Sequence, residues 1–125
     1  MGMRILIKVE GGGAFGLGHV TRSIVLANTL EEMGEHVVRF VSNDDEVSEA
    51  RLRATGIPYE ILETISSSSL RAAVDRASAD LLIIDQPTDL RQTICALRQE
   101  RRNLALAALD PPILDLTAFD MNVNL

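Results

Sequence analysis

The residues with the greatest potential for chemistry lie in the segment 16–23, whose sequence is GLGHVTRS. A helix that begins near Gly18 places His19, Arg22 and Ser23 at i, i+3 and i+4, so that their side chains share one face. A neutral imidazole can accept a proton at physiological pH, as a general base must. A guanidinium can donate two parallel hydrogen bonds to a phosphate or a carboxylate. The spacing therefore predicts His19 as a catalytic base and Arg22 as a ligand-binding residue.

Glycines dominate the residues that lead into this segment, at positions 11, 12, 13, 16 and 18. Glycine is favoured where the backbone needs a positive φ or where a ligand approaches it closely. The free N–H groups of a helix N-terminus also attract anions. We therefore expect the backbone at Gly16 and Gly18 to contact an anionic, phosphorylated ligand.

A nucleotide-triphosphate loop is one alternative for these glycines. Gly13 and Gly18 have the spacing of G-x-x-x-x-G-K-[ST]. However, His19 and Val20 occupy the positions of the lysine and of the magnesium-binding hydroxyl. The chemistry of these two side chains excludes this alternative.

A dinucleotide-binding loop is the second alternative. Gly11, Gly13 and Gly16 match G-x-G-x-x-G after an apolar segment, and Asp44 could hold a ribose. A glycine-dense loop produces this pattern by chance, and the expected start of the helix near Gly18 makes the loop longer than a tight dinucleotide turn. The alternative stays open at this point.

The elements that position these residues alternate between strand and helix patterns. We expect strands at 3–9, 37–41, 57–62, 81–84 and 104–109, a candidate sixth at 121–125, and helices over 18–33, 44–55, 66–74 and 89–102. The serine run 66–69 is interpreted as a helix cap, with a linker as the alternative. This alternation predicts the α/β class, with a Rossmann-like doubly wound parallel sheet.

Ligands of such folds bind beyond the carboxyl ends of the strands, near the point where the strand order reverses. The polar residues at the predicted strand ends are Lys8, Glu10, Asn43, Asp44, Asp85 and Asp110. We expect Lys8, Asn43 and Asp85 to contact the ligand. Asp85 is equally suited to capping a turn at 86–87, and Asp110 precedes two prolines.

Other reactive residue types have simpler interpretations. His36 lies between a glycine and a predicted strand and is interpreted as a turn residue. Cys95 lies among apolar residues of a predicted helix and is expected in the core. No histidine, cysteine and carboxylate cluster has metal-binding spacing, so we expect neither a metal nor a cofactor.

Composition limits the function classes further. A net charge of −6 and an aromatic content of 3% argue against nucleic-acid binding. No apolar run approaches the roughly 20 residues that span a bilayer, so no membrane span is expected. The single cysteine is typical of the reducing cytoplasm, which is the expected location. The length of 125 residues suits one α/β domain.

The motif G-x-G-H-x-x-R of the segment 16–22, followed by the sequence GEHVV at 34–38, resembles the N-terminal domain of GT-B-type nucleotide-sugar proteins. The similarity is greatest to the UDP-sugar hydrolases of the pseudaminic-acid pathway and to the related spore-coat polysaccharide proteins. The segments 82–85, 109–110 and 120–124 are similar to the strand–Asp and Asp-x-x-x-Asn elements of that family. The resemblance covers nearly the whole chain, but only the loop motif is specific.

This resemblance implies that His19 activates water to break a sugar–nucleotide bond. It implies a UDP-sugar held between two domains, so that residues 1–125 would be the N-terminal half and a C-terminal domain or partner subunit would complete the site. A related branch, the glycosyltransferases of lipid-linked peptidoglycan synthesis, transfers the sugar to an acceptor instead. The expected function is thus UDP-sugar hydrolysis or glycosyl transfer in surface polysaccharide synthesis.

Two functions of other classes remain as alternatives. The chain could be a binding or interaction module that a separate chain completes, with a homodimer formed through an exposed interdomain face. It could also be the NAD(P)-binding domain of a dehydrogenase, in keeping with the dinucleotide pattern.

Overall fold

The structure is a computed structural model of the chain, and it describes residues 2–12, 16–85, 91–101, 103–109 and 121–123. The strands are β1 (Arg4–Val9), β2 (Val37–Asn43), β3 (Tyr59–Leu62), β4 (Leu81–Asp85), β5 (Ala105–Leu109) and β6 (Met121–Val123). The helices are α1 (Gly18–Glu32), α2 (Glu46–Ala54), α3 (Ser67–Ala77) and α4 (Arg91–Glu100). The predicted α/β alternation is confirmed.

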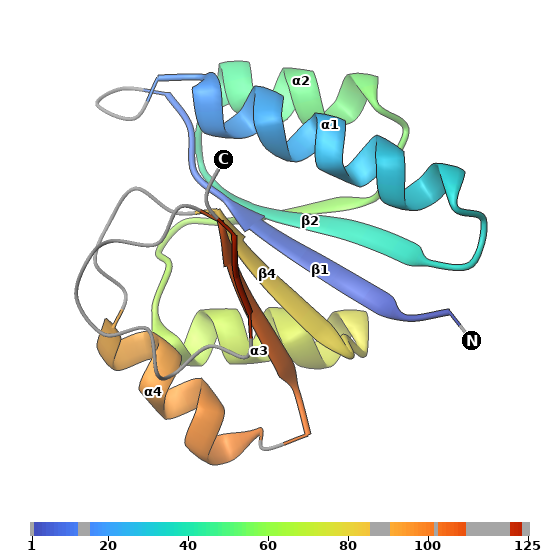
Figure 1. Cartoon of the computed structure of the whole chain (residues 1–125). Coiled ribbons are helices and arrows are strands. Elements are labelled where there is room, and N and C mark those ends of the chain that lie inside the picture. The colour runs from blue at the N-terminus through green and yellow to red at the C-terminus, as the bar shows by residue number, and fades with distance from the viewer. Residues whose placement is uncertain (1, 13–15, 86–90, 102, 110–120, 124–125) are drawn as a thin grey trace.

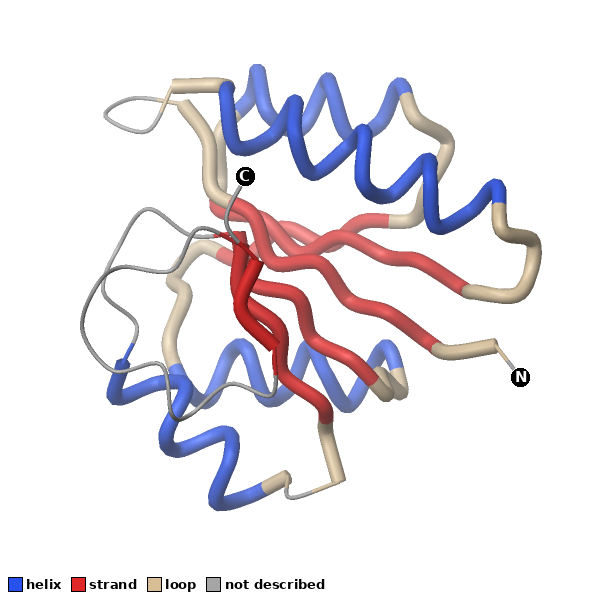
Figure 2. The backbone as a smooth tube through the Cα atoms, in the orientation of Figure 1, coloured by secondary structure: helices blue, strands red, loops and turns tan. Residues whose placement is uncertain are grey.

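The described strands form one parallel sheet in the order β3-β2-β1-β4-β5-β6. Helices α1 and α2 cover one face, and α3 and α4 cover the other (Figures 1 and 2). The chain moves outward from β1 to β3, returns through α3 to β4 beside β1, and then moves outward in the opposite direction. This is the doubly wound arrangement that the sequence predicts, with its switch point between β1 and β4.

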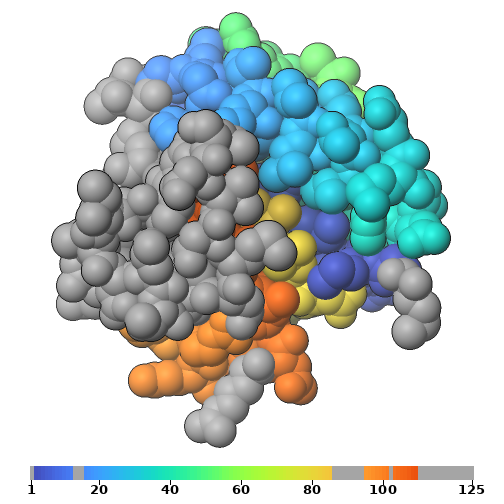
Figure 3. All heavy atoms as spheres, viewed as in Figure 1, coloured from blue at the N-terminus to red at the C-terminus, as the bar shows by residue number. Residues whose placement is uncertain are grey.

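The first strand is apolar on both faces because both faces are covered. Ile7 and Val9 belong to the core between the sheet and α1 and α2, whereas Leu6 belongs to the core beneath α3 and α4. All three are at most 2% exposed. Burial of such a side chain contributes about 1.5–3 kcal/mol, so the centre of the sheet is a rigid platform for what its ends carry. In the space-filling view, parts of β1 and β4 are visible between the surfaces of α1 and α4 (Figure 3).

Local caps explain where the helices begin and end. Gly34 follows α1 with φ of +80°, the left-handed conformation that ends a helix. Ser66 caps α3 in a reciprocal capping box, in which the hydroxyl of Ser66 accepts from N–H of Ser69 and the hydroxyl of Ser69 accepts from N–H of Ser66. The serine run is therefore a helix start, and the linker alternative is wrong.

Three details differ from the sequence expectations. Strand β2 continues to Asn43, two residues further than predicted, because its end pairs with β3 through Asn43 and Leu62. Strand β3 begins only at Tyr59. Cys95 is partly exposed instead of lying in the core. The start of the helix predicted over 89–102 and the strand end at Asp110 lie outside the described residues.

Candidate functional site

Asp85 is the centre of a polar cluster at the end of β4. Its side chain is fully buried, and its carboxylate receives four hydrogen bonds from α1. The Oδ1 atom lies 2.7 Å from Nδ1 of His19 and 2.5 Å from Nη2 of Arg22. The Oδ2 atom accepts from Oγ of Ser23 at 2.8 Å and from Nε of Arg22 at 3.1 Å. A carboxylate offers about four acceptor positions, so these four donors fill them.

The three donor residues come from the first two turns of α1, as their spacing predicts. Helix α1 follows β1, and β1 pairs with β4 so that Val9 lies opposite Asp85. The start of the helix is thereby held above the switch point of the sheet. This confirms that His19, Arg22 and Ser23 share a face, and it shows that the face is directed at the end of β4.

The contact with Asp85 indicates which nitrogen of the His19 ring carries the proton. If Nδ1 carried a lone pair, that lone pair would face the Asp85 oxygen at 2.7 Å and the two would repel. The contact with Asp85 therefore favours a proton on Nδ1, which leaves the lone pair on Nε2. Among the described residues, none makes a hydrogen bond with Nε2, and the His19 side chain is 28% exposed. A buried carboxylate that orients an imidazole in this way prepares it to accept a proton.

The guanidinium of Arg22 holds Asp85 side-on, through Nε and Nη2. Such a two-point contact holds the guanidinium and the carboxylate in one plane relative to each other. Arg22 was expected to bind the ligand through the same fork of nitrogens. Because this edge of the fork is occupied by Asp85, its position favours an internal role, and Asp85 likewise contacts α1 where a ligand contact was expected.

The base of the glycine loop is held by Asn43 at the end of β2 and by a backbone hydrogen bond within the loop. Asn43 accepts from N–H of Gly11 and donates to its carbonyl, both at 3.0 Å. The N–H of Gly12 donates to the carbonyl of Gly16 at 2.7 Å. Asn43 was expected to contact the ligand, but both ends of its amide are used to hold Gly11. Its observed role is to fix the path of the chain between β1 and α1.

The glycines differ in what the fold requires of them. A Cβ atom on Gly12, whose φ is +79°, would lie 2.0 Å from Oδ1 of Asp45. Gly16 has φ of +67°, whereas at both Gly16 and Gly18 a Cβ would meet nothing within 4 Å. Both residues are exposed at the start of α1, so the space beside them is open to a ligand, as their predicted role requires.

Lys8 lies on the other face of β1 and is 0% exposed, with its ammonium paired to the carboxylate of Glu10. Burial lowers its pKa, although the hydrogen bond and the charge of Glu10 oppose this shift. A ligand cannot reach Lys8 in this conformation, so the expectation that it binds substrate is not supported by its position. Glu10 had no assigned role, yet its spacing of two residues along a strand places it on the same face.

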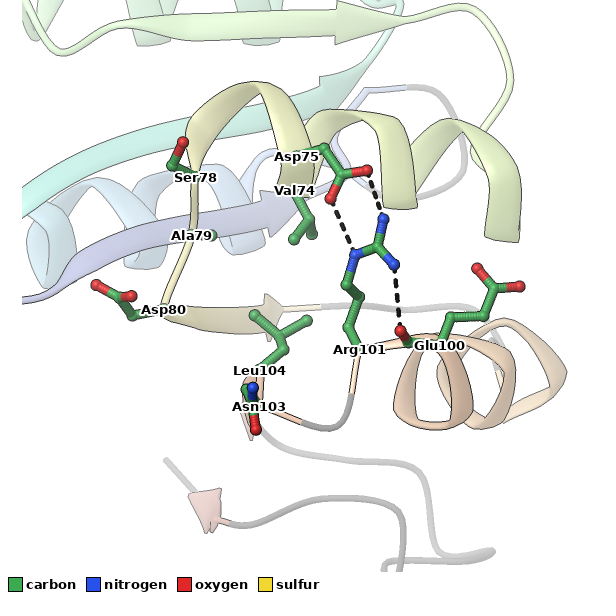
Figure 4. Close-up of a pocket in the computed structure, with 9 residues that line it drawn as sticks. All are labelled: Val74, Asp75, Ser78, Ala79, Asp80, Glu100, Arg101, Asn103 and Leu104. Carbon is green, nitrogen blue, oxygen red and sulfur yellow. Dashed lines mark hydrogen bonds and ion pairs between the residues drawn. The ribbon is translucent and has the colours of Figure 1, made fainter.

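Two features outside the cluster have structural roles. Nδ1 of His36 accepts from N–H of Met3 at 3.1 Å, which ties the turn before β2 to the start of β1. A groove of about 450 Å³ lies between the ends of α3 and α4, at the opposite edge of the sheet (Figure 4). Its central charge, Arg101, donates to both carboxylate oxygens of Asp75 at 3.0 and 2.7 Å. The charge of Arg101 is therefore paired within the groove itself.

No protein-family model matches this chain, and no curated protein matches it significantly. Within the described ranges, no group of three histidine, cysteine or carboxylate side chains could hold a metal ion. The helices of the described part are too short or too polar to cross a membrane. The functional interpretation therefore depends on the cluster around Asp85.

Proposed function

We propose that this chain is the domain of a GT-B-type hydrolase or glycosyltransferase that supplies the general base for reaction at a UDP-sugar. The observation that carries the proposal is the contact of 2.7 Å between Nδ1 of His19 and the buried Asp85, beside the glycine loop. This contact lies at the switch point of a doubly wound sheet, which is where such folds bind their ligands.

In this proposal, Nε2 of His19 takes a proton from a water molecule or from an acceptor hydroxyl. The oxygen of that molecule forms a bond to the anomeric carbon of the sugar. The bond between this carbon and the diphosphate oxygen breaks, and its electron pair leaves with UDP. The positive charge that develops on His19 lies beside Asp85, whose carboxylate stabilises it.

The diphosphate would be held by the backbone at the start of α1. The N-cap residue Leu17 makes no side-chain hydrogen bond to the N–H groups of the first turn. Their partial positive charge favours an anionic group. The adjacent Gly16 and Gly18 present no side chain that would block the approach. A second domain would complete the binding sites for the sugar and the nucleoside, as the family resemblance implies.

A dinucleotide-binding function is the second candidate, because the strand order 3-2-1-4-5-6 is also that of dinucleotide-binding domains. In the dinucleotide fingerprint, however, the third glycine packs the helix against the strand. Here Gly16 precedes the N-cap of α1. A buried aspartate that orients a histidine also has no task in binding NAD(H).

The test compares His19→Asn with the matched variant His36→Asn in the full-length protein. Asparagine at position 19 can still donate to Asp85 but has no basic nitrogen at the position of Nε2. We expect UDP release from a panel of UDP-sugars to fall by about 10²–10⁴-fold in His19→Asn, with KM little changed. His36→Asn retains an acceptor for Met3 and should keep full turnover.

Equal turnover of wild type and His19→Asn would refute the assigned base. A titration with NAD(H) separates the second candidate, since saturable binding that His19→Asn leaves intact would favour a dinucleotide site. The products distinguish the two reactions, because hydrolysis releases free sugar in water alone whereas transfer requires an added acceptor.

A further inference from the structure

We propose that Ser23 is a positioning residue that decides which ring nitrogen of His19 carries the proton. The inference rests on the proposed function of His19 as a base, and it assigns a task to a residue that does not itself reach a ligand. Ser23 is 0% exposed, and its hydroxyl donates to Oδ2 of Asp85 at 2.8 Å.

The Nδ1 atom of His19 has two neighbours that favour opposite tautomers. Oδ1 of Asp85 at 2.7 Å can only accept, so it favours a proton on Nδ1. Nη2 of Arg22 at 3.1 Å can only donate, so it favours a lone pair on Nδ1 and a proton on Nε2. Only the first tautomer leaves Nε2 free to take a proton. The cluster therefore has one contact that favours the productive tautomer of the base and one that favours the unproductive tautomer.

The orientation of the Asp85 carboxylate determines which neighbour prevails. Arg22 contacts both carboxylate oxygens, so it follows the carboxylate when that group rotates. Ser23 contacts Oδ2 alone, from a fixed position in the second turn of α1. Its hydroxyl holds Oδ2 toward the helix and thereby keeps Oδ1 against Nδ1. Without it the carboxylate can turn away from Nδ1, which leaves the guanidinium, already 3.1 Å away, as the main neighbour of Nδ1 and transfers the preference to the proton on Nε2.

The test reads the tautomer directly by long-range proton–nitrogen correlation in the ¹⁵N-histidine-labelled chain. The chain has two histidines, and they should differ. His36 accepts from Met3 through Nδ1 and therefore carries its proton on Nε2, whereas His19 should carry it on Nδ1. His36 serves as the reference for an intact fold in every variant.

In Ser23→Ala we expect His19 to change to the Nε2-protonated form while His36 is unchanged. Ser23→Cys fills similar space with a weaker donor and should change His19 in the same direction to a smaller extent. The matched control is Ser48→Ala, which also removes a buried hydroxyl that donates to an aspartate, at 2.7 Å from Asp45. This control should leave the tautomer of His19 as in the wild type.

Turnover of the UDP-sugar by the full-length protein should fall by about 10- to 100-fold in Ser23→Ala, with KM unchanged. A proton that stays on Nδ1 of His19 in Ser23→Ala would overturn the role of Ser23 and leave the proposed base intact. Full activity of His19→Asn would overturn the proposed base, whatever the tautomers are. A wild-type chain with the proton of His19 on Nε2 would overturn both.

Discussion

Lys8 and Asp85 are buried charged residues at the ends of adjacent strands, but they lie on opposite faces of the sheet. Asp85 is held by residues of α1, and Lys8 by Glu10 on the face of α3 and α4. The two side chains therefore have separate hydrogen-bond partners, although the charge of Asp85 also acts on Lys8. This separation allows the Lys8–Glu10 pair to be altered without removing a donor of the His19 cluster.

Lys8 is the only lysine of the chain, and this makes its ionisation measurable on its own. Because burial lowers its pKa below the ordinary value of 10.5, the native protein loses this proton at a lower pH than the unfolded chain does. Between these two pKa values the unfolded state binds more protons, so stability rises with pH. We expect the free energy of unfolding of the wild type to increase relative to that of Lys8→Met up to about pH 10.5.

Urea titrations of the two proteins at several pH values above neutrality check this expectation. The other ionisable groups are common to both proteins and cancel in the difference. Parallel stability curves would show that Lys8 is not perturbed by burial. A difference that falls with rising pH would show that the attraction of Glu10 prevails over desolvation.

Sequence reasoning identified the three donors of α1 at the level of single residues, because helical spacing alone brings them together. The burial of Lys8 could not be predicted, since a cation after an apolar run looks like an exposed strand end, and its contact with a ligand stays a prediction. The signal for its burial was Glu10, two residues further on the same face. The contact of Arg22 with Asp85 could not be predicted, because the two residues are separated by 63 positions in the sequence.

At the scale of elements, the glycines in the connection between β1 and α1 differ in how well they should tolerate replacement by alanine. Alanine at position 12 requires a left-handed backbone and displaces Asp45, whose side chain caps α2 through Ser48. Alanine at position 16 meets only the backbone strain, of about 1 kcal/mol. Alanine at position 18 meets neither and improves helix propensity by up to about 1 kcal/mol.

We therefore expect thermal stability to decrease in the order Gly18→Ala, Gly16→Ala, Gly12→Ala, with a loss of more than about 2 kcal/mol for the last. Denaturant titrations of the three variants measure this order. Equal losses at positions 12 and 18 would contradict the crowding at the base of the loop. A stable Gly18→Ala that nevertheless binds UDP-sugars poorly would support close approach of the ligand to the backbone there.

The helices could be predicted well because their ends carry local caps, such as Ser66 and Gly34. The hydrogen bonds that hold the base of the glycine loop could not be predicted, because Asn43 and Gly11 are 32 positions apart in the sequence. A polar residue at a strand end gives no indication of whether it meets a ligand or the chain itself. Only the register of β1 with β2 decides that Asn43 reaches Gly11.

At the scale of the whole molecule, the sheet is most stable at its centre. β1 and β4 have a hydrogen-bonded strand on each side, whereas β3 has one on a single side. We expect backbone amides of β1 and β4 to exchange with deuterium only on global unfolding, and those of β3 to exchange faster through local opening. Hydrogen exchange followed by mass spectrometry or NMR measures this gradient, and protection of β3 equal to that of β1 would contradict it.

The return of the chain through α3 to β4 has a consequence for how the protein is made. His19 and Asp85 are 66 positions apart, and a strand must be inserted beside β1 before they meet. Contacts of this separation form late, because a long loop must close first. A chain that emerges from the ribosome can complete β1 to β3 while Asp85 is still inside the exit tunnel. The pairing of His19 with Asp85 thus reports that synthesis has passed the middle of the sheet, and no shorter nascent chain can possess the oriented base.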